Sequence, residues 1–163
     1  MAIKVVGFGR QIDTKDLKPG DLAIVEIGER IFIALRIGYG GGEPFDLALA
    51  QLAGPALSKP LPHIRETGHG DYFTIPGTIV ARPSTETAPI PGGIGPGALV
   101  IDSKNVAFVR SEADGVAYYA LETGAEGKPH GERALYGQWE LVQIISETER
   151  LILRMDSSRS SRE

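Results

Sequence analysis

The sequence predicts an all-β protein built from two related halves, and three observations support that prediction. The chain of 163 residues contains 21 glycines and 11 prolines, which is typical of a fold with many turns. Its apolar residues fall in short runs rich in valine and isoleucine, separated by polar turns. One stretch of the chain also recurs later in the sequence. We therefore expect two tandem, related half-open barrels of the SH3-like kind, either separate or merged into one β-sandwich-like domain.

The repeat is anchored by two Pro-Gly pairs. Residues 19–36 resemble residues 96–110, with a shortening at the turn between two apolar runs. Further along, residues 63–72 align without a gap with residues 130–139. This alignment pairs Tyr72 with Trp139 at the end of the two segments. A repeated unit of this kind predicts two copies of one topology. Because each copy alone would be only marginally stable, we expect the copies to share an interface.

The repeat divides the chain into four parts. Residues 1–82 form the first β repeat, and residues 96–155 form the second. Residues 83–95 are rich in proline and glycine and have no apolar period, so we expect a linker there. Residues 156–163 carry no apolar side chain that a core could bury. We therefore expect this last segment to be a disordered tail.

In the first half, apolar runs predict a series of short strands. Residues 3–8 are rich in β-branched side chains and precede a glycine. Residues 21–27 and 30–37 lie close enough to form a hairpin. Residues 45–52 are ambiguous, because their alternation favours a strand while alanine and leucine favour a helix. Residues 72–81 predict two short pieces, since the Pro-Gly pair within them interrupts the hydrogen bonding of a strand.

The second half supplies strands that match those of the first. Residues 99–102, 106–110, 139–145 and 150–155 are apolar runs of strand length. Residues 116–122 match the ambiguous segment of the first half, and their valine and paired tyrosines favour a strand. We therefore predict a strand in both copies of that segment.

Four polar residues recur between the copies and form the candidate ligand site, namely Lys59, His63, Lys128 and His130. On one hypothesis the recurrence is structural, because the neighbouring prolines stiffen both loops and each histidine can satisfy loop carbonyls. On the other hypothesis, the loops present basic and imidazole groups to a small anionic ligand or to an acidic partner. We favour the structural hypothesis.

One cluster has the chemistry of a metal site. His63, Glu66 and His69 combine imidazole and carboxylate groups, which suit zinc and related ions. The glycines on both sides of His69 predict a loop, and the second copy does not repeat the three ligands. We therefore expect neither a metal nor a cofactor. The alternative is a metal site formed by these three side chains.

Composition argues against several classes of function. The net charge of −4 does not suit the broad capture of nucleic acid, which requires clustered lysine and arginine. The absence of cysteine excludes disulfides, thiolate metal sites and thiol nucleophiles. No uninterrupted apolar run approaches the length of a membrane span, about 20 residues, and no signal peptide is evident. We expect a cytoplasmic protein that does not bind membranes.

No motif in the sequence identifies a reaction. The serines lie outside any nucleophile elbow, and the acidic residues are scattered singly. We therefore expect a non-catalytic β-rich module for binding a protein partner or for assembly, self-associating through strand edges. The alternative is a small-ligand-binding protein or an enzyme with a cleft between the repeats. That alternative requires His63 and His130 to meet on one concave surface.

Overall fold

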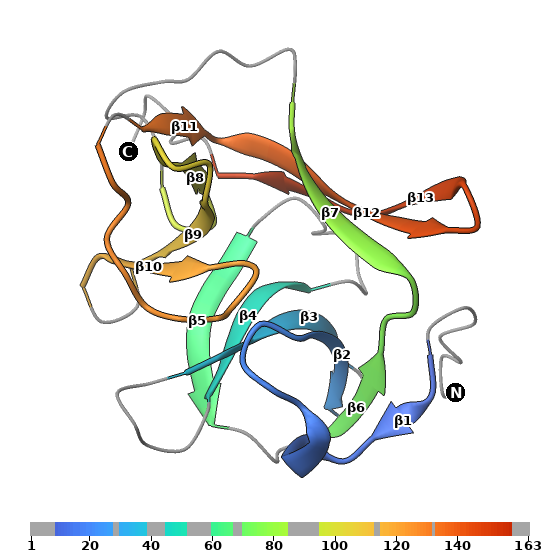
Figure 1. Ribbon diagram of the computed structural model, residues 1–163. Coiled ribbons are helices and arrows are strands. Elements are labelled where there is room, and N and C mark those ends of the chain that lie inside the picture. The colour runs from blue at the N-terminus through green and yellow to red at the C-terminus, as the bar shows by residue number, and fades with distance from the viewer. Residues whose placement is uncertain are drawn as a thin grey trace.

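The computed structural model describes residues 9–27, 30–38, 45–51, 60–66, 70–84, 95–112, 115–131 and 133–157. These residues form an all-β structure of three antiparallel sheets, none of which closes into a barrel (Figure 1). The all-β part of the predicted fold class is therefore confirmed. The helical structure in this part of the chain is one 3-10 turn, η1 (Thr14–Asp16), and none of it could span a membrane.

The first sheet contains six strands in the order β1-β6-β2-β3-β4-β5. Their bounds are β1 (Gln11–Ile12), β2 (Leu22–Ile27), β3 (Arg30–Ile37), β4 (Phe45–Gln51), β5 (Pro60–Glu66) and β6 (Asp71–Thr74). Alternation along β3 sends Ile33 and Leu35 into the main core, whereas Ala34 packs in a smaller cluster on the other face with Leu17 and Tyr72. Both faces of this sheet are therefore partly covered.

The second and third sheets contain the remaining strands, in the orders β10-β9-β8-β11 and β13-β12-β7. Their bounds are β7 (Thr78–Pro83), β8 (Leu99–Ile101), β9 (Ala107–Ser111), β10 (Ala117–Ala120), β11 (Ala134–Tyr136), β12 (Gln138–Ile145) and β13 (Thr148–Asp156). The strand β7, from the first half of the chain, pairs with β12 from the second half. The third sheet therefore joins the two halves.

The hairpins β2–β3 and β8–β9 share one pattern of backbone hydrogen bonds. The Gly20 amide donates to the Arg36 carbonyl at 2.8 Å, and the Gly97 amide donates to the Arg110 carbonyl at 2.8 Å. Both glycines have positive φ, 96° and 86°, a region that suits glycine better than other residues. The order β6-β2-β3-β4 in the first sheet also matches the order β11-β8-β9-β10 in the second.

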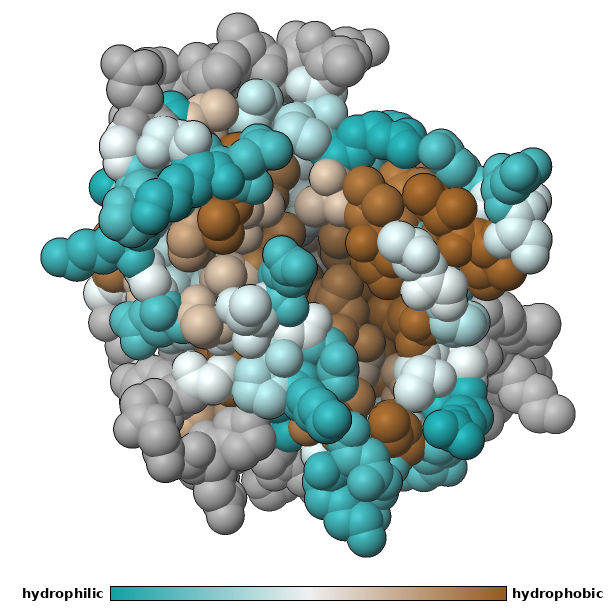
Figure 2. Space-filling view, in the orientation of Figure 1, coloured by the Kyte–Doolittle hydropathy of each residue, from teal (hydrophilic) through white to brown (hydrophobic). Residues whose placement is uncertain are grey.

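One core is shared by all three sheets. Trp139 of β12 is fully buried, and its Nε1–H donates to the Gly97 carbonyl at 2.8 Å. The same cluster contains buried side chains from each sheet, including Ile24, Ile33, Leu35, Leu99, Val109, Leu141 and Leu153. Figure 2 shows that apolar side chains also reach the surface around a hollow near the centre of the view.

Several strand predictions are confirmed. The ambiguous segment is a strand in both halves, β4 and β10. The run 72–81 is interrupted as expected, with β6 before the Pro76-Gly77 pair and β7 after it. Gly77 has a φ of 84°, and a Cβ atom there would lie 2.5 Å from the Ile144 carbonyl oxygen. This bend therefore requires glycine for two reasons.

Two expectations are wrong. The segment containing Pro60, Pro62 and His63, expected as a loop, is strand β5. It lies at the edge of the first sheet, where proline is tolerated because one side of the strand pairs with no other described strand. The alignment of Tyr72 with Trp139 also fails. Tyr72 lies in β6, beside β2, whereas the strand beside β8 is β11 and Trp139 follows it in β12.

The boundary predicted for the tail is too early. Strand β13 includes Asp156, and Ser157 is buried, with its amide and its hydroxyl donating to the Gly137 carbonyl at 2.7 and 2.9 Å. The Ser157 amide and hydroxyl make this contact, so no apolar residue marks it in the sequence. Residues 158–163 lie outside the described residues, as do the strand predicted at 3–8 and most of the predicted linker.

Candidate functional site

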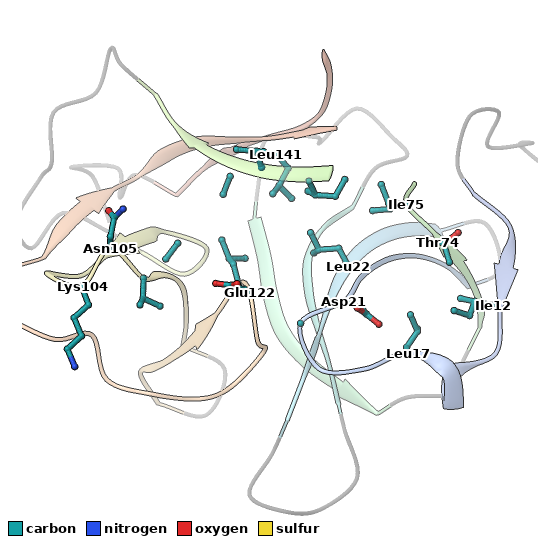
Figure 3. A pocket seen from close by; sticks show the side chains of 17 residues that line it. Ile12, Leu17, Asp21, Leu22, Thr74, Ile75, Lys104, Asn105, Glu122 and Leu141 are labelled. Carbon is teal, nitrogen blue, oxygen red and sulfur yellow. The ribbon is translucent and has the colours of Figure 1, made fainter. Parts of the chain in front are cut away.

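A cleft of about 910 Å³ opens where the three sheets meet. Its lining comes from β1, from the segment between η1 and β2 and the start of β2, from β6 and β7, from the β8–β9 turn, from the segment after β10, and from β12. Figure 3 shows these side chains around a shared space, with Leu141 on one side and Asp21 and Glu122 on the opposite side. A concave site of this size is suited to a small molecule.

The walls of the cleft are mainly apolar. Ile79 and Ala81 of β7 lie on the same face of the third sheet as Leu141 of β12, since Ala81 and Leu141 are direct cross-strand partners. Ile75, in the bend between β6 and β7, adds a further apolar side chain. Ile79 and Ala81 are only partly buried. Apolar surface therefore remains for a ligand to cover.

The rim of the cleft carries charged side chains. The Asp21 carboxylate accepts a hydrogen bond from the Lys18 amide at 2.8 Å, which fixes it at the turn before β2. Glu122 follows β10 and is exposed. Lys104 also contributes to the lining, but Figure 3 shows its side chain pointing away from the space. The two carboxylates therefore favour a cationic group over an anionic one at this rim.

Asp102 organises the turn that supplies one side of the cleft. Its buried carboxylate accepts hydrogen bonds at 3.0 Å from three amides, those of Lys104, Val106 and His130. The bond from the His130 amide, followed by that from Val106, lowers the pKa of Asp102 below its ordinary value. Asn105 has a φ of 65°, a conformation that asparagine tolerates better than most residues. One ionised carboxylate thus holds both the turn and the loop that contains His130.

The segment after β10 reaches the cleft by packing on the first sheet. The Gly38 amide donates to the Gly124 carbonyl at 3.1 Å. Gly124 has a φ of 69°, and a Cβ atom there would lie 2.2 Å from the Arg36 carbonyl oxygen. A side chain at this position would push the segment away from β3. This close approach brings Glu122 beside the turn that carries Asp21.

The predicted ligand residues that the structure describes lie outside this cleft. Lys128 and His130 are exposed in the loop before β11, and neither lines the cleft. The His130 backbone is well anchored, because its carbonyl also accepts hydrogen bonds from the Ser103 amide and hydroxyl at 3.0 and 2.9 Å. His63 lies in β5, but its side chain is outside what the structure describes, and Lys59 is outside the described residues. Convergence of the two histidines is therefore untested.

The candidate metal ligands are likewise untested. Glu66 ends β5 and only its backbone is described, as for His63, while His69 lies outside the described residues. Among the residues that the structure describes, no group of three histidine, aspartate or glutamate side chains is arranged to hold a metal ion.

A buried polar cluster on the outer face of the first sheet was not predicted. Arg36 of β3 and Asp46 of β4 are cross-strand partners, and Arg36 Nε lies 2.9 Å from Asp46 Oδ1. The Tyr72 hydroxyl donates to Asp46 Oδ2, and the Arg36 guanidinium lies 5.7 Å from the centre of the Tyr72 ring. All three side chains are buried. The sequence contains a signal of this cluster, because Arg36 and Asp46 interrupt otherwise apolar strands with opposite charges. Whether the two side chains are adjacent depends on the register in which the strands pair.

Comparisons with known proteins give no relative. No protein family matches the sequence, and neither the curated proteins nor the solved structures contain a match. The function must therefore be argued from the site itself.

Proposed function

We propose that the protein is a non-catalytic binding module, and that its binding site is the cleft between the sheets. The observation that carries this proposal is the cleft of about 910 Å³, with apolar walls from β7 and β12 and two carboxylates on its rim. The ligand it suits best has an apolar body and a cationic end. Apolar burial supplies affinity, and Asp21 and Glu122 orient the charged end.

The lining chemistry supports binding rather than catalysis. Among the described residues that line the cleft, no serine, threonine or lysine is hydrogen-bonded to a general base. The Thr74 hydroxyl, for example, donates to the Arg10 carbonyl at 3.3 Å instead. Asp21 accepts from a backbone amide. The Thr74 hydroxyl and one Asp21 carboxylate oxygen thus hold backbone groups in place, which suits a preformed binding surface.

We also propose that the two halves descend from one duplicated unit, a half-open barrel of the SH3-like kind. The matching strand orders, and the matching hydrogen bonds from Gly20 and Gly97, support this origin. The antiparallel pairing of β7 with β12 supports it too, because each strand follows the corresponding strand of its own half. On this proposal the cleft is the space between the repeats. An experimental structure with a different strand order in the second sheet would refute it.

Binding of a neutral apolar dye tests the cleft. Nile red should fluoresce in the presence of the protein, and Ile79→Asn should weaken its binding about tenfold by placing an amide on the apolar wall. Val116→Asn is the matched control, because Val116 is 56% exposed and lies outside the cleft. Melting temperatures of both variants check folding. Equal dye affinity in the two variants would place the dye elsewhere and contradict the proposal.

A further inference from the structure

The cleft follows one edge of strand β7. Three consecutive residues of that strand line it, namely Ile79, Val80 and Ala81. Successive side chains of a strand point to opposite faces of the sheet, so a cavity that touches all three residues also borders the backbone between them. Figure 3 shows β7, in pale green, along one side of the space, with Ile75 toward one end and Asn105 toward the other. The backbone of β7 is therefore part of the wall of the cleft.

One set of backbone groups in β7 faces away from the third sheet. The Ser84 amide donates to the Gln138 carbonyl at 3.1 Å, which fixes the phase of the hydrogen bonds between β7 and β12. Because antiparallel pairs alternate, Val80 directs its amide and carbonyl toward β12, whereas Ile79 and Ala81 direct theirs away from it. No described residue forms a hydrogen bond with these outward groups. An edge of this kind is a template for another strand.

The residues of β7 suit an edge that receives a partner. Pro83 ends the strand at a position whose nitrogen also faces away from β12, so the proline removes no hydrogen bond from the third sheet. Before it, Ile79 and Ala81 each offer an amide and a carbonyl to a neighbour. The side chains of these two residues pack against the main core, on the same face as Leu141. Alternate side chains of an added strand would enter the cleft on that face.

We propose that the ligand of the cleft is an extended peptide segment of another protein, which pairs with the outward edge of β7 and places alternate apolar side chains in the cleft. This inference rests on the proposed function and names the class of its ligand. The apolar walls suit the alternate side chains, and the carboxylates of Asp21 and Glu122, on the side opposite Leu141, suit a lysine or arginine among them. Backbone hydrogen bonds supply affinity for any extended chain, and the side chains in the cleft supply specificity.

Amide hydrogen exchange measured by NMR tests the pairing on the unaltered protein. The probe is the peptide acetyl-Lys-Thr-Val-Thr-Val-Thr-amide, which has lysine and valine on one face of the extended chain and threonine on the other. At saturation it should slow the exchange of the Ile79 and Ala81 amides at least tenfold. Val80 and Arg82 are the matched controls, because their amides face β12 and should slow far less. Slow exchange of Ile79 and Ala81 before the peptide is added would show that the edge is already paired and would overturn the proposal.

N-methylated forms of the peptide separate backbone pairing from side-chain burial. In a paired strand only every second residue directs its amide toward the neighbour. One form is therefore methylated at the amides of the lysine and valines, and the other at the amides of the threonines. One of the two forms should lose affinity at least tenfold, and the other should bind like the parent peptide. Equal affinities of the two forms would overturn the proposal, since neither set of amides would then face β7.

Two further measurements test the side chains and the cleft. A peptide with glutamate in place of lysine should bind more weakly, because its carboxylate meets those of Asp21 and Glu122, and equal or tighter binding would contradict the proposal. Nile red distinguishes a failure of this inference from a failure of the proposed function. Dye binding that Ile79→Asn weakens, without any effect of the peptide on exchange, would overturn the inference and leave the cleft as a binding site. Failure of both the dye and the peptide would overturn both.

Discussion

Arg36 in the first sheet and Arg110 in the second occupy the same place in the backbone hydrogen bonding, but their side chains have different surroundings. Arg36 is 2% exposed and pairs with Asp46 beneath Tyr72. Arg110 is partly exposed, and it donates to the Tyr118 hydroxyl at 3.3 Å and to Glu112 at 3.0 Å. The same scaffold therefore holds one arginine in a fully buried polar cluster and the other at a partly exposed position. The energetic role of each arginine should follow its burial rather than its place in the fold.

Removing the acidic partner of each arginine should give the largest difference between the halves. Asp46→Asn should cost about 3 to 5 kcal/mol, because it leaves the buried charge of Arg36 without its carboxylate. Glu112→Gln should cost about 1 kcal/mol or less, because Arg110 is partly exposed and keeps the Tyr118 hydroxyl as a partner. Urea denaturation of both variants beside the native protein measures the difference. Equal losses would show that burial does not separate the two arginines.

Removing the hydroxyl of Tyr72 or of Tyr118 should give a smaller difference in the loss of stability, again with the larger loss in the first half. Tyr72→Phe deletes the donor to Asp46 and should cost about 1 to 3 kcal/mol, because the acceptor is buried. Tyr118→Phe deletes a longer, partly buried contact with Arg110 and should cost about 0.5 kcal/mol. The two variants are matched, since each loses one hydroxyl from a strand. A larger loss at Tyr118 would reverse the comparison.

The stability of the fold should depend on pH through Asp102, which lies in the second half. Its pKa is lowered in the folded state, so its contribution is present above the unfolded pKa, about 3.9, and is lost as the pH falls through the folded pKa. Denaturation midpoints should therefore fall below about pH 4. Asp102→Asn should lower stability at pH 7 and flatten the acid dependence. An unchanged acid profile in this variant would assign the dependence to other carboxylates.

The smallest effect is expected at His130. The His130 contacts with Asp102 and Ser103 use backbone atoms, and its side chain is exposed. His130→Gln should therefore change the free energy of unfolding by about 0.5 kcal/mol or less, the usual range for surface changes. The structural role proposed for its loop would then reside in the backbone. A loss of several kcal/mol would instead implicate the imidazole.

Alternation and turn residues predicted most strands of the fold. The hairpin β2–β3, the break at Pro76-Gly77 and the strand character of β4 and β10 follow from local patterns. Strand β5 could not be recognised, because proline is read as a strand breaker unless the edge position is known. The equivalence of Tyr72 and Trp139 failed because a separate strand, β11, precedes Trp139, and its three residues are too few for an alternating pattern to reveal it.

The cleft could not be predicted from the sequence. Its walls come from segments far apart in the chain, among them Asp21, Ile79, Lys104 and Leu141, and no local pattern marks them as neighbours. The recurring lysines and histidines are conspicuous in the sequence because they are polar and repeated. Lys128 and His130, the two that are described, lie outside the cleft. Apolar binding surfaces resemble core positions in sequence, and only tertiary structure separates them.

The most direct measurement compares two ligands with the same tail and opposite charge. Octylamine and octanoate should be titrated into the isotope-labelled protein while methyl and amide chemical shifts are recorded. We expect octylamine to perturb Ile79, Leu121 and Leu141 around the cleft and to bind more tightly than octanoate, because Asp21 and Glu122 lie on the rim. Stronger binding of octanoate, or perturbations confined to exposed positions such as Val116, would contradict the assignment of the cleft as the binding site.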